Sequence, residues 1–128
     1  MGLLKDKVRQ KTIRDFDNQW ILHGGKLDND YWASDDVLID QFSSLFSLSE
    51  IQNKIVADIG SGTGRIVKSL LKNNPKKVYA IEPSIAGVNH IKKNLNSYTN
   101  LSVLQIDGLN FKTPELCDII ISLGVIHH

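Results

Sequence analysis

The chain has 128 residues, of which 41% are hydrophobic and 23% charged, and its formal net charge is +1 at pH 7. A chain of this length forms one domain with a buried core, and it lacks the excess of one charge that marks a nucleic-acid or membrane surface. No apolar run approaches the roughly 20 residues that span a bilayer, and the amino-terminal residues lack the apolar core of a signal peptide. We therefore expect a cytoplasmic protein with no nucleic-acid and no membrane partner.

The charges are nevertheless unevenly placed along the chain. Residues 1–14 contain only one acid, Asp6, whereas residues 15–50 are rich in acids and contain the single base Lys26. The bases of the first segment are Lys5, Lys7, Arg9, Lys11 and Arg14. A solvated helix face and a contact with an anionic partner both fit this pattern.

Helical patterns occupy the amino-terminal part of the chain. Apolar and aromatic residues recur at helical spacing in residues 3–22, which predicts one or two helices. After a polar loop, Ser34 is a candidate N-cap of a further helix that ends near residue 46. Ser47 and Glu50 have the spacing of a capping box and predict a short helical turn before the first strand.

From Lys54 onward, strand patterns alternate with helical patterns. The expected strands are residues 54–59, 78–81, 101–106 and 117–123, and the expected helices are residues 64–73 and 84–94. Strands separated by helices of this length predict parallel βαβ units with right-handed crossovers, and hence an α/β fold. The last strand pattern is apolar almost throughout, which places the single cysteine, Cys117, in the core rather than at a reactive site.

Three glycines on alternate positions, Gly60, Gly62 and Gly64, follow the first expected strand. Glycine adopts backbone angles closed to other residues and lets a ligand approach the main chain, where the free N–H groups of the next helix point. This pattern predicts a nucleotide-like cofactor. A dinucleotide fingerprint would need its third glycine at the position of Arg65, and the loop lacks the Gly-Lys-Ser/Thr end of a P-loop. Close packing of strand and helix is the alternative role for these glycines.

Ligands of such sheets bind beyond the carboxyl ends of the strands, so the residues directly after each strand are the candidates. Ser61 lies in the glycine loop, Glu82 and Pro83 follow the second strand, and Asp107 and Gly108 follow the third. Glu82 has the spacing from the first glycine at which an acid accepts hydrogen bonds from both ribose hydroxyls. Asp107, one strand further out, is placed to accept a hydrogen bond from an adenine amine.

Four segments resemble the successive motifs of class I S-adenosylmethionine-dependent methyltransferases. They are Val56-Ala-Asp-Ile-Gly-Ser-Gly-Thr-Gly64, Ala80-Ile-Glu-Pro-Ser84, Gln105-Ile-Asp-Gly108 and Ser122-Leu-Gly-Val-Ile-His-His128. The resemblance implies a Rossmann-like three-layer αβα fold with a parallel sheet, of which the chain would hold the first four of seven strands. It implies an amino-terminal helical cap over residues 1–50 and a cofactor-binding half over residues 51–128, truncated after the fourth strand.

The same resemblance implies S-adenosylmethionine as the cofactor and a small-molecule methyl acceptor. It implies that the glycine loop packs against the methionine part and that Asp58 fixes the loop or the amino group. It further implies Glu82 on the ribose, Asp107 on the adenine amine, and residues 122–125 beneath the sulfonium. The expected cofactor-binding residues are Asp58, Gly60, Ser61, Gly62, Gly64, Glu82, Pro83, Asp107, Gly108 and Ser122.

Several of these side chains have a structural alternative. Asp58 can act as a hydrogen-bond acceptor within its strand, since a buried acid must be paired. His127 is the weak candidate for a catalytic base; it points away from its neighbour His128 along an extended chain, which argues against a metal site. Aromatic residues of the amino-terminal part are interpreted as core or lid packing rather than substrate contacts: Trp20, Tyr31 and Trp32.

The hypothesis for the activity is direct in-line displacement at the sulfonium, which needs alignment and desolvation, and needs a base only if the acceptor must lose a proton. The alternatives are a non-catalytic cofactor-binding or pairing module and, less favoured, an NAD-dependent oxidoreductase. A fourth strand left as an open sheet edge predicts a homodimer through that edge.

Overall fold

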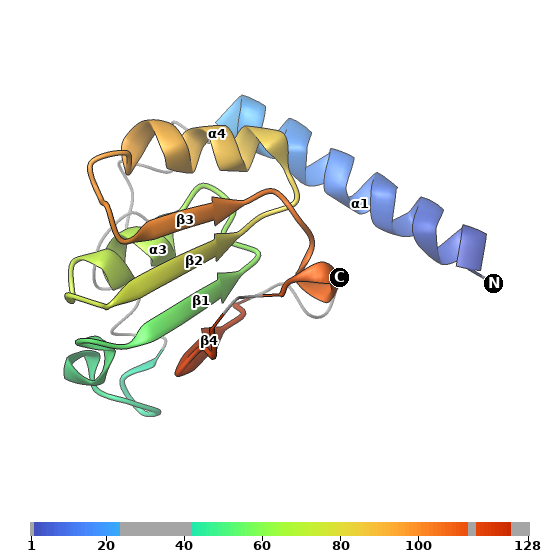
Figure 1. The fold of residues 1–128 in the computed structure, drawn as a ribbon. Coiled ribbons are helices and arrows are strands. Elements are labelled where there is room, and N and C mark those ends of the chain that lie inside the picture. The colour runs from blue at the N-terminus through green and yellow to red at the C-terminus, as the bar shows by residue number, and fades with distance from the viewer. Residues whose placement is uncertain (1, 24–41, 113–114, 124–128) are drawn as a thin grey trace.

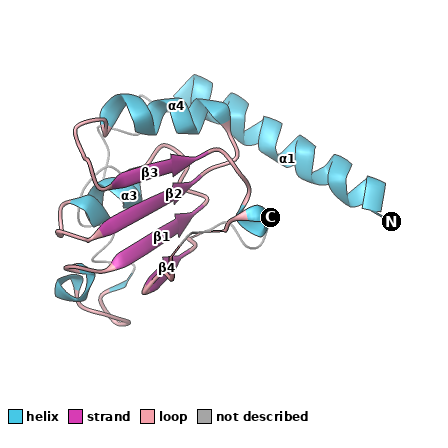
Figure 2. Ribbon diagram, viewed as in Figure 1, coloured by secondary structure: helices cyan, strands magenta, loops and turns pink. Residues whose placement is uncertain are grey.

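The computed structural model describes residues 2–23, 42–112 and 115–123. A long helix, α1 (Gly2–His23), is followed by alternating strands and helices, as Figure 2 shows. One continuous helix therefore occupies the region where one or two were predicted. No helix in these described ranges has both the length and the apolarity to cross a membrane.

The centre of the molecule is a parallel sheet of β1 (Ile55–Ile59), β2 (Lys77–Ile81), β3 (Leu101–Leu104) and β4 (Ile119–Ile121), in the order β3-β2-β1-β4. The chain adds β2 and β3 on one side of β1 and then returns to place β4 on the other side. This reversal creates a switch point between β1 and β4, the place where ligands of open α/β sheets bind. The predicted parallel α/β fold is confirmed.

Three strands are shorter than predicted, the first by one residue at its start. The third ends at Leu104, not at residue 106, because its partner β2 ends at the paired residue Ile81. The fourth covers only Ile119–Ile121, within a predicted range of 117–123, although its partner β1 extends one residue beyond the paired positions at each end. The neighbouring strand, rather than the apolar run, therefore sets the limit of β3 but not that of β4.

Helices α3 (Arg65–Leu71) and α4 (Ile85–Asn94) pack on one face of the sheet (Figure 1). Both crossovers move the chain in the same direction, so right-handed connections place both helices on that face. Val67, Leu70 and Ile91 from the helices join Val56 and Val78 from the strands in one buried cluster. Such a cluster holds the carboxyl ends of β1 and β2 at a fixed distance from the helix starts that follow them.

The other face of the sheet carries a smaller cluster that includes Ala57, Tyr79 and Ile81, against which Phe111 and Cys117 pack. Cys117 was predicted to be buried in the core, but it is half-buried at the edge of this cluster. Partial burial and the nearby carboxylate of Glu115 raise the pKa of its thiol. A raised pKa keeps the thiol protonated, which fits packing and not nucleophilic chemistry.

The segment before β1 begins with the end of the predicted 34–46 helix, of which residues 34–41 lie outside the described part. Phe46 N donates to Phe42 O at 3.0 Å, as in a last helical turn. The predicted capping box is confirmed: Ser47 caps the short 3₁₀ helix η3 (Leu48–Ile51), and Ser47 N donates to a Glu50 carboxylate oxygen at 2.6 Å. Ile51, fully buried, ties this turn to the main cluster.

Candidate cofactor site at the carboxyl ends of the strands

The loop after β1 lies directly against the end of β2. Gly60, Gly62 and Gly64 have φ angles of 77°, 56° and 92°, in the left-handed region that side chains with a Cβ rarely adopt. Gly60 N and Ser61 N both donate to Ile81 O, at 2.8 and 3.0 Å. The three glycines are therefore required by the backbone path itself, which turns tightly from β1 into α3.

Glu82, the first residue after β2, ties the glycine loop to the start of α4. Its carboxylate accepts from Gly62 N at 2.6 Å and from Ser84 N at 2.9 Å, and the residue is only 4% exposed. Burial raises the pKa of Glu82, and the two backbone hydrogen bonds oppose this rise. Each carboxylate oxygen has a second lone pair, so this geometry still allows Glu82 to accept hydrogen bonds from ribose hydroxyls.

Asp58 lies inside β1, two residues before the first glycine, and is 3% exposed. Burial raises its pKa to about 7; the nearby Glu82 carboxylate adds to this, while Ser61 and the Arg65 guanidinium oppose it. The Ser61 hydroxyl donates to the Asp58 carbonyl at 2.8 Å, which closes the loop onto the strand. A buried acid with such a raised pKa is a candidate for a functional group as well as a structural one.

Gly87 in α4 is a residue of the site that the sequence analysis missed. A Cβ built on Gly87 would lie 2.6 Å from Gly62 O and 2.9 Å from Glu82 Cγ. Its lack of a side chain lets α4 approach the glycine loop more closely than any other residue type would permit. The signal in the sequence is a glycine three residues after the N-cap Ser84, inside a helix, where glycine is otherwise unfavourable.

Asp107 follows β3 and caps the short 3₁₀ helix η4 (Gly108–Asn110), accepting from Leu109 N and Asn110 N at 3.0 and 3.2 Å. A Cβ on Gly108 would lie 2.5 Å from Ile59 Cγ2, so Gly108 allows the turn to lie against the end of β1. The second carboxylate oxygen of Asp107 accepts from the guanidinium of Arg9 in α1. Asp107 therefore lies beyond β3 as expected, with its carboxylate shared between the start of η4 and Arg9.

Helix α1 is attached to the same edge of the sheet by a second contact. One Asp17 carboxylate oxygen accepts from the Ser84 hydroxyl at 2.7 Å and from Ala86 N at 2.8 Å, at the first turn of α4. The hydrogen bond from Ala86 N is the largest cause that lowers the pKa of Asp17, and the Ser84 hydroxyl adds to it. Together with Arg9, this contact holds α1 across the carboxyl ends of β2 and β3 (Figure 1).

Two buried hydroxyls at this edge have no hydrogen-bond partner among the described residues, those of Thr63 and Ser122. Thr63 lies in the glycine loop, and Ser122 follows β4 on the far side of the switch point. A buried polar group without a partner costs free energy, so both hydroxyls are suited to contact a polar ligand. The N–H groups of Gly60, Ser61, Gly62 and Gly64 are already hydrogen-bonded within the protein, so the two hydroxyls and the Glu82 carboxylate are the polar groups suited to contact S-adenosylmethionine.

The structure thus places every described residue of the expected site at one edge of the sheet, just beyond the strands, apart from Asp58 inside β1. A hydrogen bond joins Glu82 to the glycine loop, but within the described ranges no hydrogen bond joins Asp107 or Ser122 to that pair. Several residues named in the sequence analysis lie outside the part of the chain that the structure describes. They are the predicted base His127, its neighbour His128, residues 124 and 125, Tyr31, Trp32 and the side chain of Trp20.

A parallel sheet with this strand order and an acid after β2 that holds the glycine loop is the arrangement of class I S-adenosylmethionine-dependent methyltransferases. The chain belongs to the methyltransferase domain family, which matches residues 56–128. The predicted family, fold and cofactor are thereby confirmed.

Among curated relatives, the chain is 33% identical over 87 residues to the tRNA U34 carboxymethyltransferase of Campylobacter lari, a match that covers 63% of this chain and 28% of that protein. The enzyme of the same name from Campylobacter fetus is 29% identical over 94 residues, covering 69% of this chain and 32% of that protein. The chain thus spans about a third of the length of these relatives. Because their names give tRNA as the substrate, the expectation of a small-molecule acceptor and no nucleic-acid partner is wrong for this group of proteins.

Solved structures agree with the fold. A candidate RNA methyltransferase of Pyrococcus horikoshii superposes with a TM-score of 0.59 at 27% identity, covering 68% of this chain and 44% of that one. A phosphoethanolamine N-methyltransferase of Haemonchus contortus, solved with S-adenosylhomocysteine, gives a TM-score of 0.64 at 21% identity, covering 86% of this chain and 25% of that one. The second likeness shows the fold alone.

Proposed function

We propose that this chain is the cofactor-binding part of an S-adenosylmethionine-dependent transferase that modifies tRNA. The observation that carries the proposal is the 33% identity to a tRNA U34 carboxymethyltransferase over 87 residues, which cover 63% of this chain. The candidate RNA methyltransferase from Pyrococcus horikoshii supports the same class of acceptor. A cytoplasmic location follows from this proposal, since tRNA is modified where it is used.

The proposed roles follow from the contacts of each residue. Gly60, Ser61, Gly62 and Gly64 hold the methionine part of the cofactor, with Asp58 fixing the loop from below. Glu82, beside Pro83, accepts from the ribose; Asp107 accepts from the adenine amine where Gly108 makes room; and Ser122 lies near the sulfonium. We propose that residues 51–128 form the cofactor-binding unit and that residues 1–50 cover it.

When bound, S-adenosylmethionine supplies a group activated for transfer by the positive sulfonium. The residues of this chain contribute orientation: Glu82 fixes the loop and the ribose, and the buried environment around Asp58 excludes water. Correct alignment of donor and acceptor in a dry site accounts for a large part of the rate of such transfers. The role proposed here for Asp58 and Glu82 is alignment of the cofactor, and no proton transfer is assigned to them.

The test is incubation of the chain with labelled S-adenosylmethionine and a tRNA transcript that carries uridine at position 34. Mass spectrometry of the digested nucleosides shows which nucleoside carries the methyl group. A parallel incubation with a sulfonium donor that carries carboxymethyl in place of methyl tests the group in the names of the relatives. A transcript with cytidine at position 34 is the matched control. Label in the first RNA alone supports the proposal; a chain that binds S-adenosylhomocysteine but neither binds nor labels tRNA contradicts it.

A further inference from the structure

We propose that the outward face of α1, formed by Lys7, Lys11 and Arg14, is the surface that contacts the phosphate backbone of the RNA. This inference rests on the proposed tRNA acceptor and adds the place at which it binds. Residues 1–14 carry most of the local positive charge of the amino-terminal part, and the cofactor site itself does not use these three side chains.

The geometry of the helix separates two faces. Arg9, Ile13 and Phe16 lie at intervals of four and three residues, and all three are half-buried against the body of the protein. A shift of two residues rotates a side chain by about 200° around an α-helix. Lys7, Lys11 and Arg14 repeat this spacing, and each precedes one of the three half-buried residues by two positions. They therefore lie on the opposite face of the helix, and all three are exposed.

The exposed face has few competing contacts within the described residues. Lys11 Nζ lies 2.6 Å from an Asp15 carboxylate oxygen, but the two side chains are 70% and 60% exposed. An exposed pair of this kind contributes only about 0 to 1 kcal/mol, so a phosphate can replace Asp15 as the partner of Lys11. Among the described residues, neither Lys7 nor Arg14 has a side-chain hydrogen bond or an ion pair.

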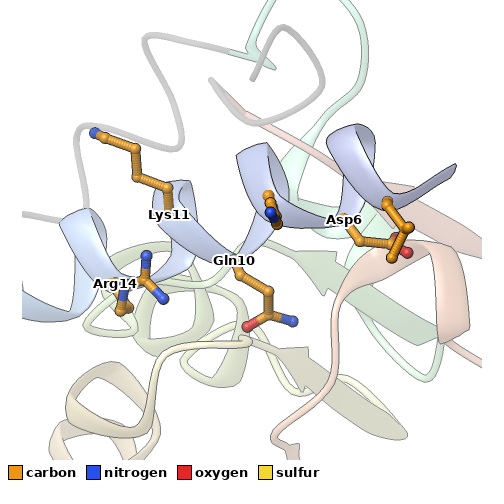
Figure 3. A pocket seen from close by; sticks show the side chains of 6 residues that line it. Asp6, Gln10, Lys11 and Arg14 are labelled. Carbon is orange, nitrogen blue, oxygen red and sulfur yellow. The ribbon is translucent and has the colours of Figure 1, made fainter. Parts of the chain in front are cut away.

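Figure 3 shows side chains that line an open surface pocket on this side of the helix. The side chains that line it include one acid, Asp6, and three cations; the full set is Leu3, Asp6, Lys7, Gln10, Lys11 and Arg14. The excess of positive charge suits a polyanion, and Lys and Arg are the usual partners of phosphate oxygens. Gln10 adds an amide that can donate to a sugar or phosphate oxygen.

The anchors of α1 bring this face to the right place. Arg9 binds Asp107 beyond β3, and Asp17 binds Ser84 and Ala86 beyond β2. The helix therefore crosses the edge of the sheet where the cofactor site lies, and its amino-terminal half extends past the strands (Figure 1). An RNA held along the outward face of α1 therefore binds at the edge of the sheet that carries the cofactor site.

The experiment compares binding of a tRNA transcript to the chain as a function of salt. Each phosphate contact contributes about −0.7 to −0.9 to the slope of log affinity against log salt concentration, so replacement of Lys7, Lys11 and Arg14 by Gln is expected to reduce the slope by roughly 2 to 3. The control removes the same charge with Lys76→Gln, Lys92→Gln and Lys93→Gln. These exposed residues lie at the other end of the sheet and helices. Gln replaces Lys and Arg with little change in helix propensity.

The proposal predicts an unchanged slope for the control variant and unchanged binding of S-adenosylhomocysteine by both variants. The proposed surface is wrong if both variants lose the same amount of slope, or if the α1 variant loses none while the wild-type chain binds tRNA. Neither result contradicts tRNA as the acceptor. A wild-type chain that does not bind tRNA at any salt concentration rejects both. If sedimentation shows that the α1 variant loses self-association and keeps its affinity for tRNA, the face contacts a second copy and the proposal fails.

Discussion

The glycine loop with Glu82 and the helix α1 meet at the same edge of the sheet, but they are built in opposite ways. The loop is buried, its glycines have backbone angles that only glycine adopts readily, and Glu82 holds it by hydrogen bonds to main-chain N–H groups. Helix α1 is mostly exposed and is attached through the side chains of Arg9 and Asp17. The cofactor site therefore depends on the core of the protein, whereas the RNA surface that we propose on α1 is exposed and can be changed without unfolding the protein.

The largest expected effect concerns the pH dependence of stability through Asp58. Its folded pKa of about 7 lies above the unfolded value of 3.8, so the folded state binds more protons between these pH values. The free energy of unfolding should therefore fall as pH rises from about 4 to about 7, by at most about 4 kcal/mol. The raised pKa of Glu82 acts in the same direction.

Urea unfolding at several pH values measures this effect. Asp58→Asn, which cannot ionise, should flatten the profile in this window and should be more stable than the wild-type chain near pH 7. If the profile of Asp58→Asn runs parallel to that of the wild type, the burial of a protonatable Asp58 is refuted.

Removal of the Glu82 carboxylate is the next largest change. Glu82→Ala leaves Gly62 N and Ser84 N without their acceptor inside the protein, which should lower the free energy of unfolding by about 3 kcal/mol and weaken cofactor binding. Glu82→Gln keeps the shape and one acceptor oxygen, so its loss should be smaller. Thermal unfolding measures the loss of stability, and calorimetry with S-adenosylhomocysteine measures the loss of cofactor affinity. Equal stability of the wild type, Glu82→Ala and Glu82→Gln would contradict the role of Glu82 in holding the loop.

Gly87→Ala tests the close approach of α4 to the loop. The added methyl group would meet Gly62 O and Glu82 Cγ at distances that force one of them to move, and we expect a loss of stability of about 1 to 3 kcal/mol together with weaker cofactor binding. Gly2→Ala is the matched control, because a Cβ there meets nothing within 4 Å. Chemical denaturation measures the stability of the two variants. If Gly87→Ala is more stable than the wild type, α4 does not approach the loop as closely as described.

The smallest expected effect comes from the anchors of α1. Asp17→Ala removes the acceptor for the Ser84 hydroxyl and Ala86 N, which should cost about 1 kcal/mol in stability. Its effect on cofactor affinity should be smaller than that of Glu82→Ala, since the loop remains intact. Hydrogen exchange should show faster opening of α1 with little change in β1 and β2; a change spread over the sheet would erase the difference between the two regions.

Features that depend on neighbours in sequence were predictable, and features that depend on neighbours in space were not. The Ser47 and Glu50 capping box is local and was found from spacing alone. The glycine loop and Glu82 were located because parallel strands bring their carboxyl ends to one edge. The end of β3, by contrast, depends on the length of β2 beside it, which an apolar run does not reveal.

The contacts of α1 could not be read from the sequence. Arg9 and Asp107 are separated by 98 residues, and no local pattern distinguishes Arg9 from the other bases around it. The sequence also could not show what the Glu82 carboxylate contacts. An acceptor for ribose hydroxyls and an acceptor for backbone N–H groups need the same residue at the same position. Gly87 was the one missed residue with a visible signal, a glycine in the first turn of a helix.

The most direct test of the central claim, that the crevice beside the glycine loop holds S-adenosylmethionine, is titration calorimetry of the chain with S-adenosylhomocysteine and, in parallel, with NAD. The account predicts one saturable site for S-adenosylhomocysteine, weakened in Glu82→Ala, and no heat of binding with NAD. Binding of NAD without binding of S-adenosylhomocysteine would contradict it.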